Sequence, residues 1–325
     1  MPGLRLDAIV VRDPTRRARA AVAHPDARLL TSADEIWTSA ADIDLVVVAA
    51  PNRVHAELSH AAIAAGIAVV VDKPLARSAA EAGELVAAAT RAGVMLTPFQ
   101  NRRWDGDLLT VAGLIAAGTL GRVDRFESRF ERWRPEVASG WRERSDPDEA
   151  GGVLVDLGSH LVDQALYLFG PVAAVYAEID VRRPGAQVDD DAFIALTHAS
   201  GVRSHLWMSA VAAQPGPRMR VLGDRAGYVK FGLDVQEDAL LTGAQPGGPG
   251  WGEEPPDRWG RLGAGDATVT VPTVAGAYQR FYEGVVATLQ NGAPPPVDPA
   301  DAVTGLAILE AARASSRDRR TVLMD

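Results

Sequence analysis

The chain has 325 residues, 47% of them hydrophobic, and a formal net charge of −9. This length and apolar content suffice for two ordinary domains, whereas the acidic balance argues against a surface that binds nucleic acid. The lack of cysteine excludes disulfides, thiolate metal sites and a cysteine nucleophile, and suits the cytoplasm. The longest apolar run, 61–71, is shorter than the roughly 20 residues that span a bilayer, so we expect no membrane partner.

The first hundred residues alternate short apolar runs with stretches of helical spacing. Continuous apolar runs, typical of parallel strands buried on both faces, occur at 6–11, 45–50, 67–71 and 94–98. Stretches with helical spacing lie between them at 53–65 and 78–92, and Asp13-Pro14 is a typical helix start. This alternation predicts a Rossmann-type, doubly wound parallel sheet in a dinucleotide-binding domain over residues 1–100.

Residues 101–325 show a different pattern and are predicted to form an α+β domain. Its strands, expected in one open and mainly antiparallel sheet, lie at 122–133, 174–182, 192–197, 203–212 and 218–222. One helix at 155–169 interrupts them, and the Gly- and Pro-rich stretch 243–265 is expected to be a long surface loop. Two C-terminal helices, predicted at 277–290 and 299–314, can pack back on the first domain.

The run at 67–71 ends in Asp72-Lys73-Pro74. In open α/β sheets, ligands bind beyond the carboxyl ends of the strands, so an ammonium here lies beside the expected site and can act in proton transfer. Pro74 restricts the backbone directly after the lysine. The alternative is a solvated lysine in an ordinary turn.

A second pattern places Asp156, His160 and Asp163 on neighbouring faces of the helix predicted at 155–169, because they are four and three residues apart. A histidine oriented by a carboxylate is a common general base. Alternatively, these residues only fix the contact between the two domains. A metal would need further ligands, so none is expected.

Two more segments follow predicted strands. Pro51-Asn52 comes after the run at 45–50, and His55 lies in the first helical turn, where free N–H groups can bind a ligand. The stretch 99–107, with its two arginines and a tryptophan, follows the run at 94–98 and can line a hydroxyl-rich pocket. The alternatives are a structural His55 and arginines in surface ion pairs.

In combination, the motifs VVVDKP, PNRVH and DLGSHLVD resemble those of the Gfo/Idh/MocA oxidoreductases, in order and at matching strand and helix positions. The resemblance extends from Leu4 to the C-terminal helices. The stretches NRRWDGDLLTV and FERWRPEV are most similar to the branch that contains NADP-dependent scyllo-inositol dehydrogenases. The resemblance implies hydride transfer between a nicotinamide cofactor and a cyclic polyol or sugar, without a metal.

The resemblance also implies roles for individual residues. Lys73 would contact the substrate hydroxyl and the nicotinamide ribose, with Asp72 in place of the family's usual glutamate, and Asp156 and His160 would form the catalytic pair with His160 as proton acceptor. The other expected cofactor-binding residues are Pro51, Asn52, His55, Asp72 and Pro74. The expected substrate-binding residues are Asn101, Arg103, Trp104 and Asp163.

The end of the run at 6–11 bears on the choice of cofactor. An acidic residue there binds the ribose of NAD, whereas an arginine accommodates the 2′-phosphate of NADP. Asp13 is needed as the helix cap, so Arg12 is expected to face the 2′ position, which favours NADP while NAD stays possible. The alternative is that Arg12, Arg16 and Arg17 only form a solvated helix start.

The chain lacks the first strand and the G-x-G-x-x-G loop with which such a fold begins, since its G-x-G patterns near 250 and 263 follow no predicted strand. The first strand is central in the 3-2-1-4-5-6 order, so its absence leaves two strands facing a gap. We therefore expect the natural protein to start upstream. Without that segment, the dinucleotide affinity of this chain is open.

Three functions follow from these patterns. The first is an NADP-dependent polyol or sugar dehydrogenase with a small-molecule substrate. The second is a non-catalytic sensor or binding protein of the same fold, and the third is a glycosidase that uses a tightly held NAD. The exposed face of the open sheet is expected to pair in a homo-oligomer.

Overall fold

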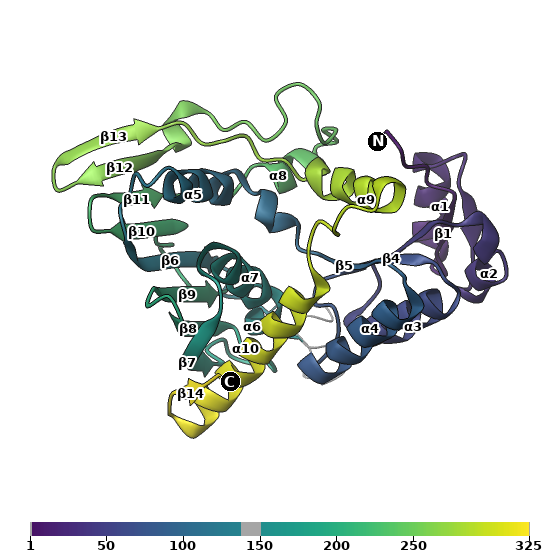
Figure 1. The fold of residues 1–325 in the computed structure, drawn as a ribbon, viewed down its shortest axis with the longest axis horizontal. Helices are drawn as coiled ribbons and strands as arrows, with labels where there is room; N and C mark the ends of the chain where they lie inside the picture. The colour runs from purple at the N-terminus through teal and green to yellow at the C-terminus, as the bar shows by residue number, and fades with distance from the viewer. Residues whose placement is uncertain (1, 138–150, 325) are drawn as a thin grey trace.

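Five short parallel strands build the N-terminal part of the chain (Figure 1). The computed structural model describes residues 2–137 and 151–324. Strand β1 (Ala8–Val10) pairs with β2 (Arg28–Leu30) in one sheet. A second sheet has the order β3-β4-β5, with β3 at Leu45–Val48, β4 at Ala68–Asp72 and β5 at Leu96–Phe99. Val69, Val70 and Val71 of β4 are fully buried, which explains why the apolar run of this central strand is continuous.

The parallel sheet is interrupted between β1 and β3. No strand in the described part of the chain pairs with both, and the 3-2-1-4-5-6 order places its first strand at this position. The exposed fractions of Val10 in β1 and Val47 in β3, 40% and 47%, are high for apolar strand residues. The strands have therefore not closed up over the gap.

Helices cover the parallel strands. Their bounds are α1 Pro14–Ala23, α2 Asp34–Trp37, α3 His55–Ala64 and α4 Ala79–Ala92, with short 3₁₀ helices η1 Ala40–Asp42, η2 Asn52–Val54 and η3 Asn101–Trp104. Asp13 caps α1 as expected, because its side chain accepts the N–H of Arg16 at 2.7 Å. Ala62 of α3 and Leu85 of α4 are fully buried and pack with β4 in one hydrophobic cluster.

The C-terminal part is built on a nine-stranded sheet of order β13-β12-β11-β10-β6-β9-β8-β7-β14. All its pairs are antiparallel except β6 with β9. The strands are β6 Val123–Glu131, β7 Val172–Asp180, β8 Asp191–His198, β9 Arg203–Ser209, β10 Met219–Gly223, β11 Gly227–Lys230, β12 Gly260–Ala264, β13 Ala267–Val271 and β14 Val322–Leu323. The predicted fold class, a Rossmann-type domain plus an α+β domain, is thereby confirmed.

Helices pack on one face of this sheet (Figure 1). They are α5 Gly106–Ala116, α6 Val153–Asp156, α7 Gly158–Phe169 and α10 Pro299–Asp318, while α8 Gln236–Leu241 and α9 Gln279–Asn291 lie toward the N-terminal part. The helix predicted at 155–169 is divided at Leu157, where α6 ends and α7 begins. The core beneath includes Phe126, Leu161 and Ile308.

Some expectations were wrong in detail. Residues 243–265 were predicted to form a loop, but they include the 3₁₀ helix η6 (Pro256–Arg258) and strand β12. Strand β12 pairs with β11 and with β13. Four glycines lie in or beside these strands, and glycine weakens the sequence signal of a strand. Strands β2, β11, β13 and β14 and helix α5 were not predicted, and most of these elements are too short to show a clear period.

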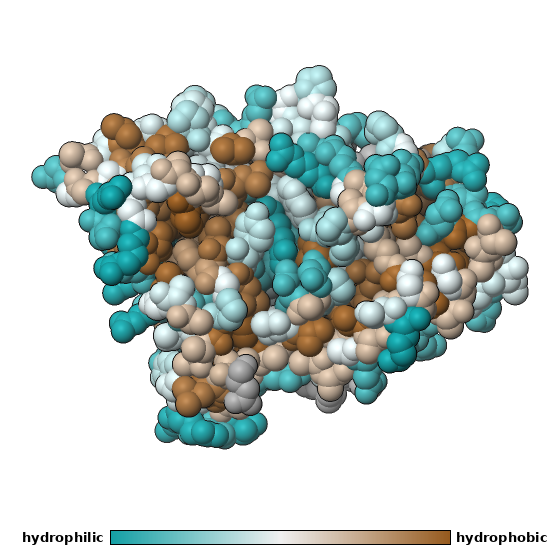
Figure 2. Space-filling view, in the orientation of Figure 1, coloured by the Kyte–Doolittle hydropathy of each residue, from teal (hydrophilic) through white to brown (hydrophobic). Residues whose placement is uncertain are grey.

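The two C-terminal helices join both parts of the molecule. Leu306 of α10 belongs to the cluster beneath β4, whereas Ile308 and Leu309 pack beneath the large sheet. Phe281 and Val285 of α9 contact Val70 of β4. Figure 2 shows hydrophilic residues running between the apolar areas of the two parts. The contact between the parts is therefore apolar along the helices and polar where the strands end.

Candidate functional site

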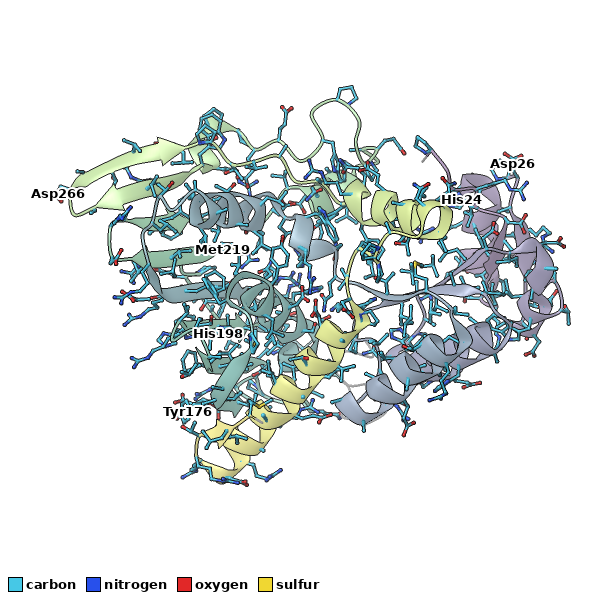
Figure 3. All side chains as sticks on the ribbon, in the orientation of Figure 1. His24, Asp26, Tyr176, His198, Met219 and Asp266 are labelled. Carbon is cyan, nitrogen blue, oxygen red and sulfur yellow. The ribbon has the colours of Figure 1, made fainter. Side chains whose placement is uncertain are left out.

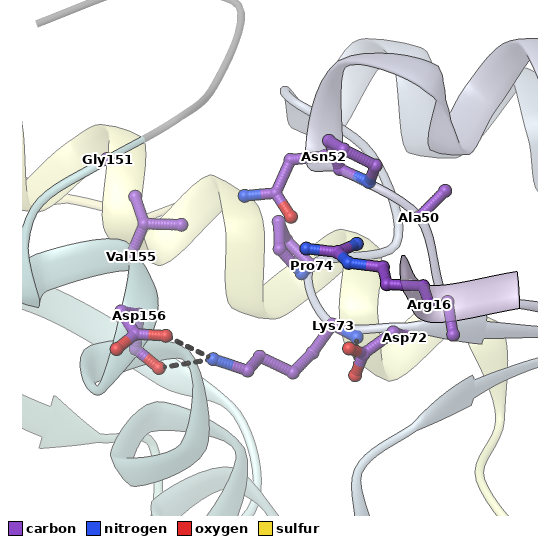
Figure 4. A pocket seen from close by; sticks show the side chains of 11 residues that line it. Arg16, Ala50, Asn52, Asp72, Lys73, Pro74, Gly151, Val155 and Asp156 are labelled. Atoms are coloured by element: carbon purple, nitrogen blue, oxygen red, sulfur yellow. Dashed lines mark hydrogen bonds and ion pairs between the residues drawn. The ribbon is translucent and has the colours of Figure 1, made fainter. Parts of the chain in front are cut away.

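A cavity of about 230 Å³ opens at the carboxyl ends of β3 and β4 (Figure 4). Six predicted site residues line it: Pro51, Asn52, Asp72, Lys73, Pro74 and Asp156. Arg16, Ala49, Ala50, Gly151 and Val155 complete the lining. Strands β3 and β4 are adjacent and parallel, so their ends meet at one edge, and α6 brings Asp156 to it from the other part of the chain. The position agrees with the general rule for ligands of open α/β sheets.

Lys73 and Asp156 form an ion pair across this cavity. The Nζ of Lys73 lies 2.7 Å from Oδ1 of Asp156 and 2.7 Å from its backbone oxygen (Figure 4). The Lys73 side chain is only 15% exposed, and the N–H of Lys73 donates to Oδ1 of Asp72 at 2.8 Å. Two contacts to one residue fix the ammonium in place and leave a further proton for a ligand.

His160 lies one helical turn beyond Asp156, on α7, and is 6% exposed. Its Nδ1 is 3.2 Å from Oε1 of Gln100, the residue that follows β5. With Oε1 of Gln100 facing the ring, Nδ1 is the donor of this bond, and the neutral ring then carries its lone pair on Nε2. Gln100 thus sets the tautomer that a general base at Nε2 requires.

The surroundings of His160 keep it neutral. Burial holds the pKa of its imidazole well below the usual value of 6.5. The positive charges that lower this pKa further are, in decreasing order, those of Lys73, Arg102, Arg218 and Arg132. The ring can therefore accept a proton near neutral pH, since it is not already protonated.

His55 lies beside the cavity rather than in its lining. It is fully buried, with Nδ1 2.8 Å from the oxygen of Pro74 and Nε2 2.8 Å from the oxygen of Ala50. The ring thereby joins the chain segment after β3 to the segment after β4. We interpret His55 as a residue that positions the two segments of the cofactor side, and its direct contact with a cofactor stays a prediction.

The arginines around the start of α1 have different surroundings. The Nε of Arg12 donates to the oxygen of Thr31 at 3.2 Å, and Arg17 donates to the oxygens of Leu29 and Leu30. Arg16 lines the cavity instead, with no side-chain hydrogen bond or ion pair in the described ranges (Figure 4). The sequence singled out Arg12 and gave no signal that Arg16 would turn inward.

The predicted substrate-binding residues lie deeper between the two parts of the molecule. Arg103 binds Asp163 through two bonds of 2.9 and 2.7 Å, and Asp301 of α10 at 2.8 Å. Trp104 packs edge-on against Phe281 at 5.8 Å between ring centroids. Figure 3 shows nitrogen- and oxygen-bearing side chains gathered between α7, α9 and α10. None of these three predicted residues, nor Asn101, lines the cavity.

The donors at the cavity fit the phosphate and ribose oxygens of a nicotinamide dinucleotide. Arg16, Asn52 and Lys73 supply a guanidinium, an amide and an ammonium at the ends of parallel strands, where this fold binds nucleotides. Residues 2–137 and 151–324 contain no cluster of three or more His, Asp or Glu side chains that could hold a metal ion. Over the same ranges, no helix is both long and apolar enough to cross a bilayer.

Two family models match the chain. The model described as the NAD-binding Rossmann fold of an oxidoreductase family matches residues 1–100, and the model of the C-terminal alpha/beta domain of the same family matches residues 112–324.

Among curated relatives, the chain is 36% identical to scyllo-inositol 2-dehydrogenase (NADP(+)) IolW of Bacillus subtilis. The alignment extends over 305 residues and covers 93% of this chain and 84% of that protein. The chain is 30% identical to the D-apiose dehydrogenase of Paraburkholderia graminis, over 87% of this chain and 74% of that protein. Among solved structures, an oxidoreductase of Bacillus subtilis, YvaA, superimposes with a TM-score of 0.93 at 34% identity, covering 99% of this chain and 91% of that one.

Proposed function

Because the chain belongs to the Gfo/Idh/MocA oxidoreductase family, we propose that it is an NADP-dependent dehydrogenase that oxidises a CH–OH group of an inositol-like cyclic polyol or a sugar. The observation that carries this proposal is the arrangement of Lys73, Asp156 and His160 at one end of the parallel strands. The names of the relatives support the substrate class, since one acts on scyllo-inositol with NADP and another on D-apiose.

The three residues divide the reaction between them. Bound NADP⁺ would supply the acceptor for the hydride of the reacting C–H bond. The Lys73 ammonium, held by Asp156, donates a hydrogen bond to the oxygen on the reacting carbon. His160 accepts the hydroxyl proton at Nε2, because Nδ1 is occupied by Gln100 and the low pKa of the ring leaves Nε2 free. We further propose that Asn101 and Trp104 face the substrate and that Arg103 and Asp163 position α7 through their ion pair.

The test is a direct assay of the purified protein with NADP or NAD and a panel of inositols and aldoses, read as absorbance of the reduced nicotinamide. We expect turnover with scyllo-inositol and NADP. A protein that binds the dinucleotide but turns over no member of the panel would be a binding protein or sensor instead. A protein that retains NAD through purification and cleaves glycosides would favour the glycosidase alternative.

The cofactor preference is tested by two arginine variants. We expect Arg12→Gln to raise the KM for NADP about 10–100-fold and to leave that for NAD unchanged, since only NADP carries the 2′-phosphate and one charge-assisted hydrogen bond contributes about 1.5–3 kcal/mol. Arg16→Gln should raise both, because Arg16 lines the cavity shared with Asn52 and Lys73. Equal KM values for NADP in Arg12→Gln and in the unmodified protein would contradict the assignment of Arg12.

We also propose that copies of the chain associate through the face of the large sheet that the helices leave open. This face carries packed aromatic residues, with the ring of Phe193 5.0 Å from that of Trp207 and the Arg129 guanidinium 3.9 Å from the Trp207 ring centroid. The aromatic side chains of this face can pack against the same face of a second copy of the chain.

A location in the cytoplasm stays a prediction.

A further inference from the structure

Arg132 follows strand β6 and continues its alternation. Phe126, Ser128 and Phe130 are buried on the helix-covered face of the sheet, so Arg132 lies two residues further along the same face. Its N–H donates to the oxygen of Ser209 at 2.8 Å, which keeps the backbone extended there. The Phe130 ring centroid is 6.3 Å from that of His160. On this face, Arg132 therefore comes directly after Phe130, the residue whose ring contacts the candidate base His160.

The other cations whose charges act on His160 each have a carboxylate partner. Lys73 pairs with Asp156, Arg102 with Asp105 and Glu237, and Arg218 with Asp107. Arg132 has no side-chain hydrogen bond, ion pair or ring contact within residues 2–137 and 151–324, although it is half-buried. A half-buried guanidinium that finds no partner among the described residues has lost part of its hydration without gaining acceptors from them.

The charges around Arg132 indicate what kind of acceptor suits it. Burial and the charge of Arg134 lower the pKa of the Arg132 guanidinium, and Glu237 and Asp156 raise it; Arg102 lowers it. On balance the pKa is lowered, so the surroundings leave the guanidinium short of acceptor oxygens. A planar guanidinium binds two neighbouring oxygens with two parallel N–H groups, and adjacent hydroxyls of the proposed polyol offer such a pair.

We propose that Arg132 is a substrate-binding residue that determines specificity, donating hydrogen bonds to two adjacent hydroxyl oxygens of the polyol away from the reacting carbon. This inference rests on the proposed dehydrogenase function. It adds to that function a second attachment point, directly after strand β6 of the large sheet. A substrate held at both points presents one particular CH–OH group to His160.

The test compares Arg132→Gln, Arg132→Lys and the control Arg225→Gln, which removes an exposed arginine from the turn between β10 and β11. With scyllo-inositol and NADP, we expect Arg132→Gln to raise the KM for the polyol about 10–100-fold. The Kd of the reduced cofactor, measured by its fluorescence, should be unchanged. Arg132→Lys should recover part of the loss, and the control should behave as the unmodified protein.

Monodeoxy-inositols supply the specific readout. The analogue that lacks a hydroxyl bound by Arg132 should have the same KM in the unmodified protein and in Arg132→Gln, whereas the parent polyol should not. If the unmodified protein is active and Arg132→Gln changes kcat alone, with KM and discrimination intact, the inference is wrong and the proposed function stands. If the unmodified protein turns over no polyol, both are overturned.

Discussion

We expect Lys73→Met to lower kcat with scyllo-inositol and NADP by about 10²–10⁴-fold, the usual contribution of a positioned acid–base group. The variant removes the ammonium that Asp156 holds at 2.7 Å and leaves no other donor in its place. Its stability should change little, by about 1 kcal/mol, because the Asp156 side chain is 29% exposed and can be hydrated after the pair is lost. The measurements are steady-state turnover and urea unfolding of the same preparation.

The chain offers a matched control, since its only other lysine is Lys230. The Lys230 side chain is fully buried, and its Nζ lies 3.0 Å from Oε1 of Glu254 and 3.0 Å from the oxygen of Phe231. Lys230→Met leaves the buried Glu254 carboxylate without this partner, which should lower the free energy of unfolding by about 3–5 kcal/mol. The folded fraction should keep its kcat, because this pair joins β11 to the segment before β12, away from the cavity.

The two variants should thus separate chemistry from stability. Normal turnover in Lys73→Met would show that the ammonium takes no part in the reaction, whatever the cavity binds. Loss of turnover in fully folded Lys230→Met would show that the site extends to the Lys230–Glu254 pair. An Asp156→Asn variant should resemble Lys73→Met in kcat but to a smaller degree, since the backbone oxygen of residue 156 still holds the ammonium.

The sequence located the catalytic candidates because they lie on strongly patterned elements. Strand β4 is an unbroken apolar run, so its end, and with it Lys73, could be placed closely. Asp156 and His160 fall on one apolar helical stretch, which the structure divides at Leu157. Asp156 lines the cavity, and His160 lies on α7, outside the lining. The local sequence pattern is sufficient to place a residue whose position depends only on its own helix or strand.

Residues whose role depends on distant segments could not be found this way. Gln100 becomes important only because α7, 60 positions later in the chain, places His160 within 3.2 Å of it. Arg16 was one of several arginines at a helix start, and nothing in that pattern distinguishes a side chain that turns into the cavity. Arg103 and Asp163 were expected near the substrate, yet each satisfies the other across 60 positions, a pairing that spacing along one helix does not predict.

Gln100 permits a sharper test of the base, through the pH dependence of kcat/KM. When His160 is protonated, Nε2 cannot accept a proton, so activity must fall as the pH drops through the pKa of the ring. Burial and the nearby cations hold that pKa well below 6.5, and we expect the acid limb of the profile to lie below pH 6.5. This limb reports the ionisation of the free enzyme.

Two substitutions at Gln100 should change this profile in different ways. Gln100→Glu puts a carboxylate 3.2 Å from Nδ1, which stabilises the charged ring and should move the acid limb to higher pH by about 1–3 units, with turnover retained above it. Gln100→Leu leaves the buried Nδ1–H without an acceptor, so the required tautomer is no longer favoured. Turnover should then fall about 10–100-fold at every pH, without an upward shift of the limb.

The contrast between these variants identifies the group that is titrated. A purely structural role for Gln100 predicts that both variants lose stability and activity together, with the acid limb in place. A base other than His160 predicts that Gln100→Glu leaves the limb unmoved, because the added charge lies next to Nδ1 of this ring alone among the described histidines. Only an upward shift in Gln100→Glu together with a pH-independent loss in Gln100→Leu assigns the proton to Nε2 of His160 and the choice of tautomer to Gln100.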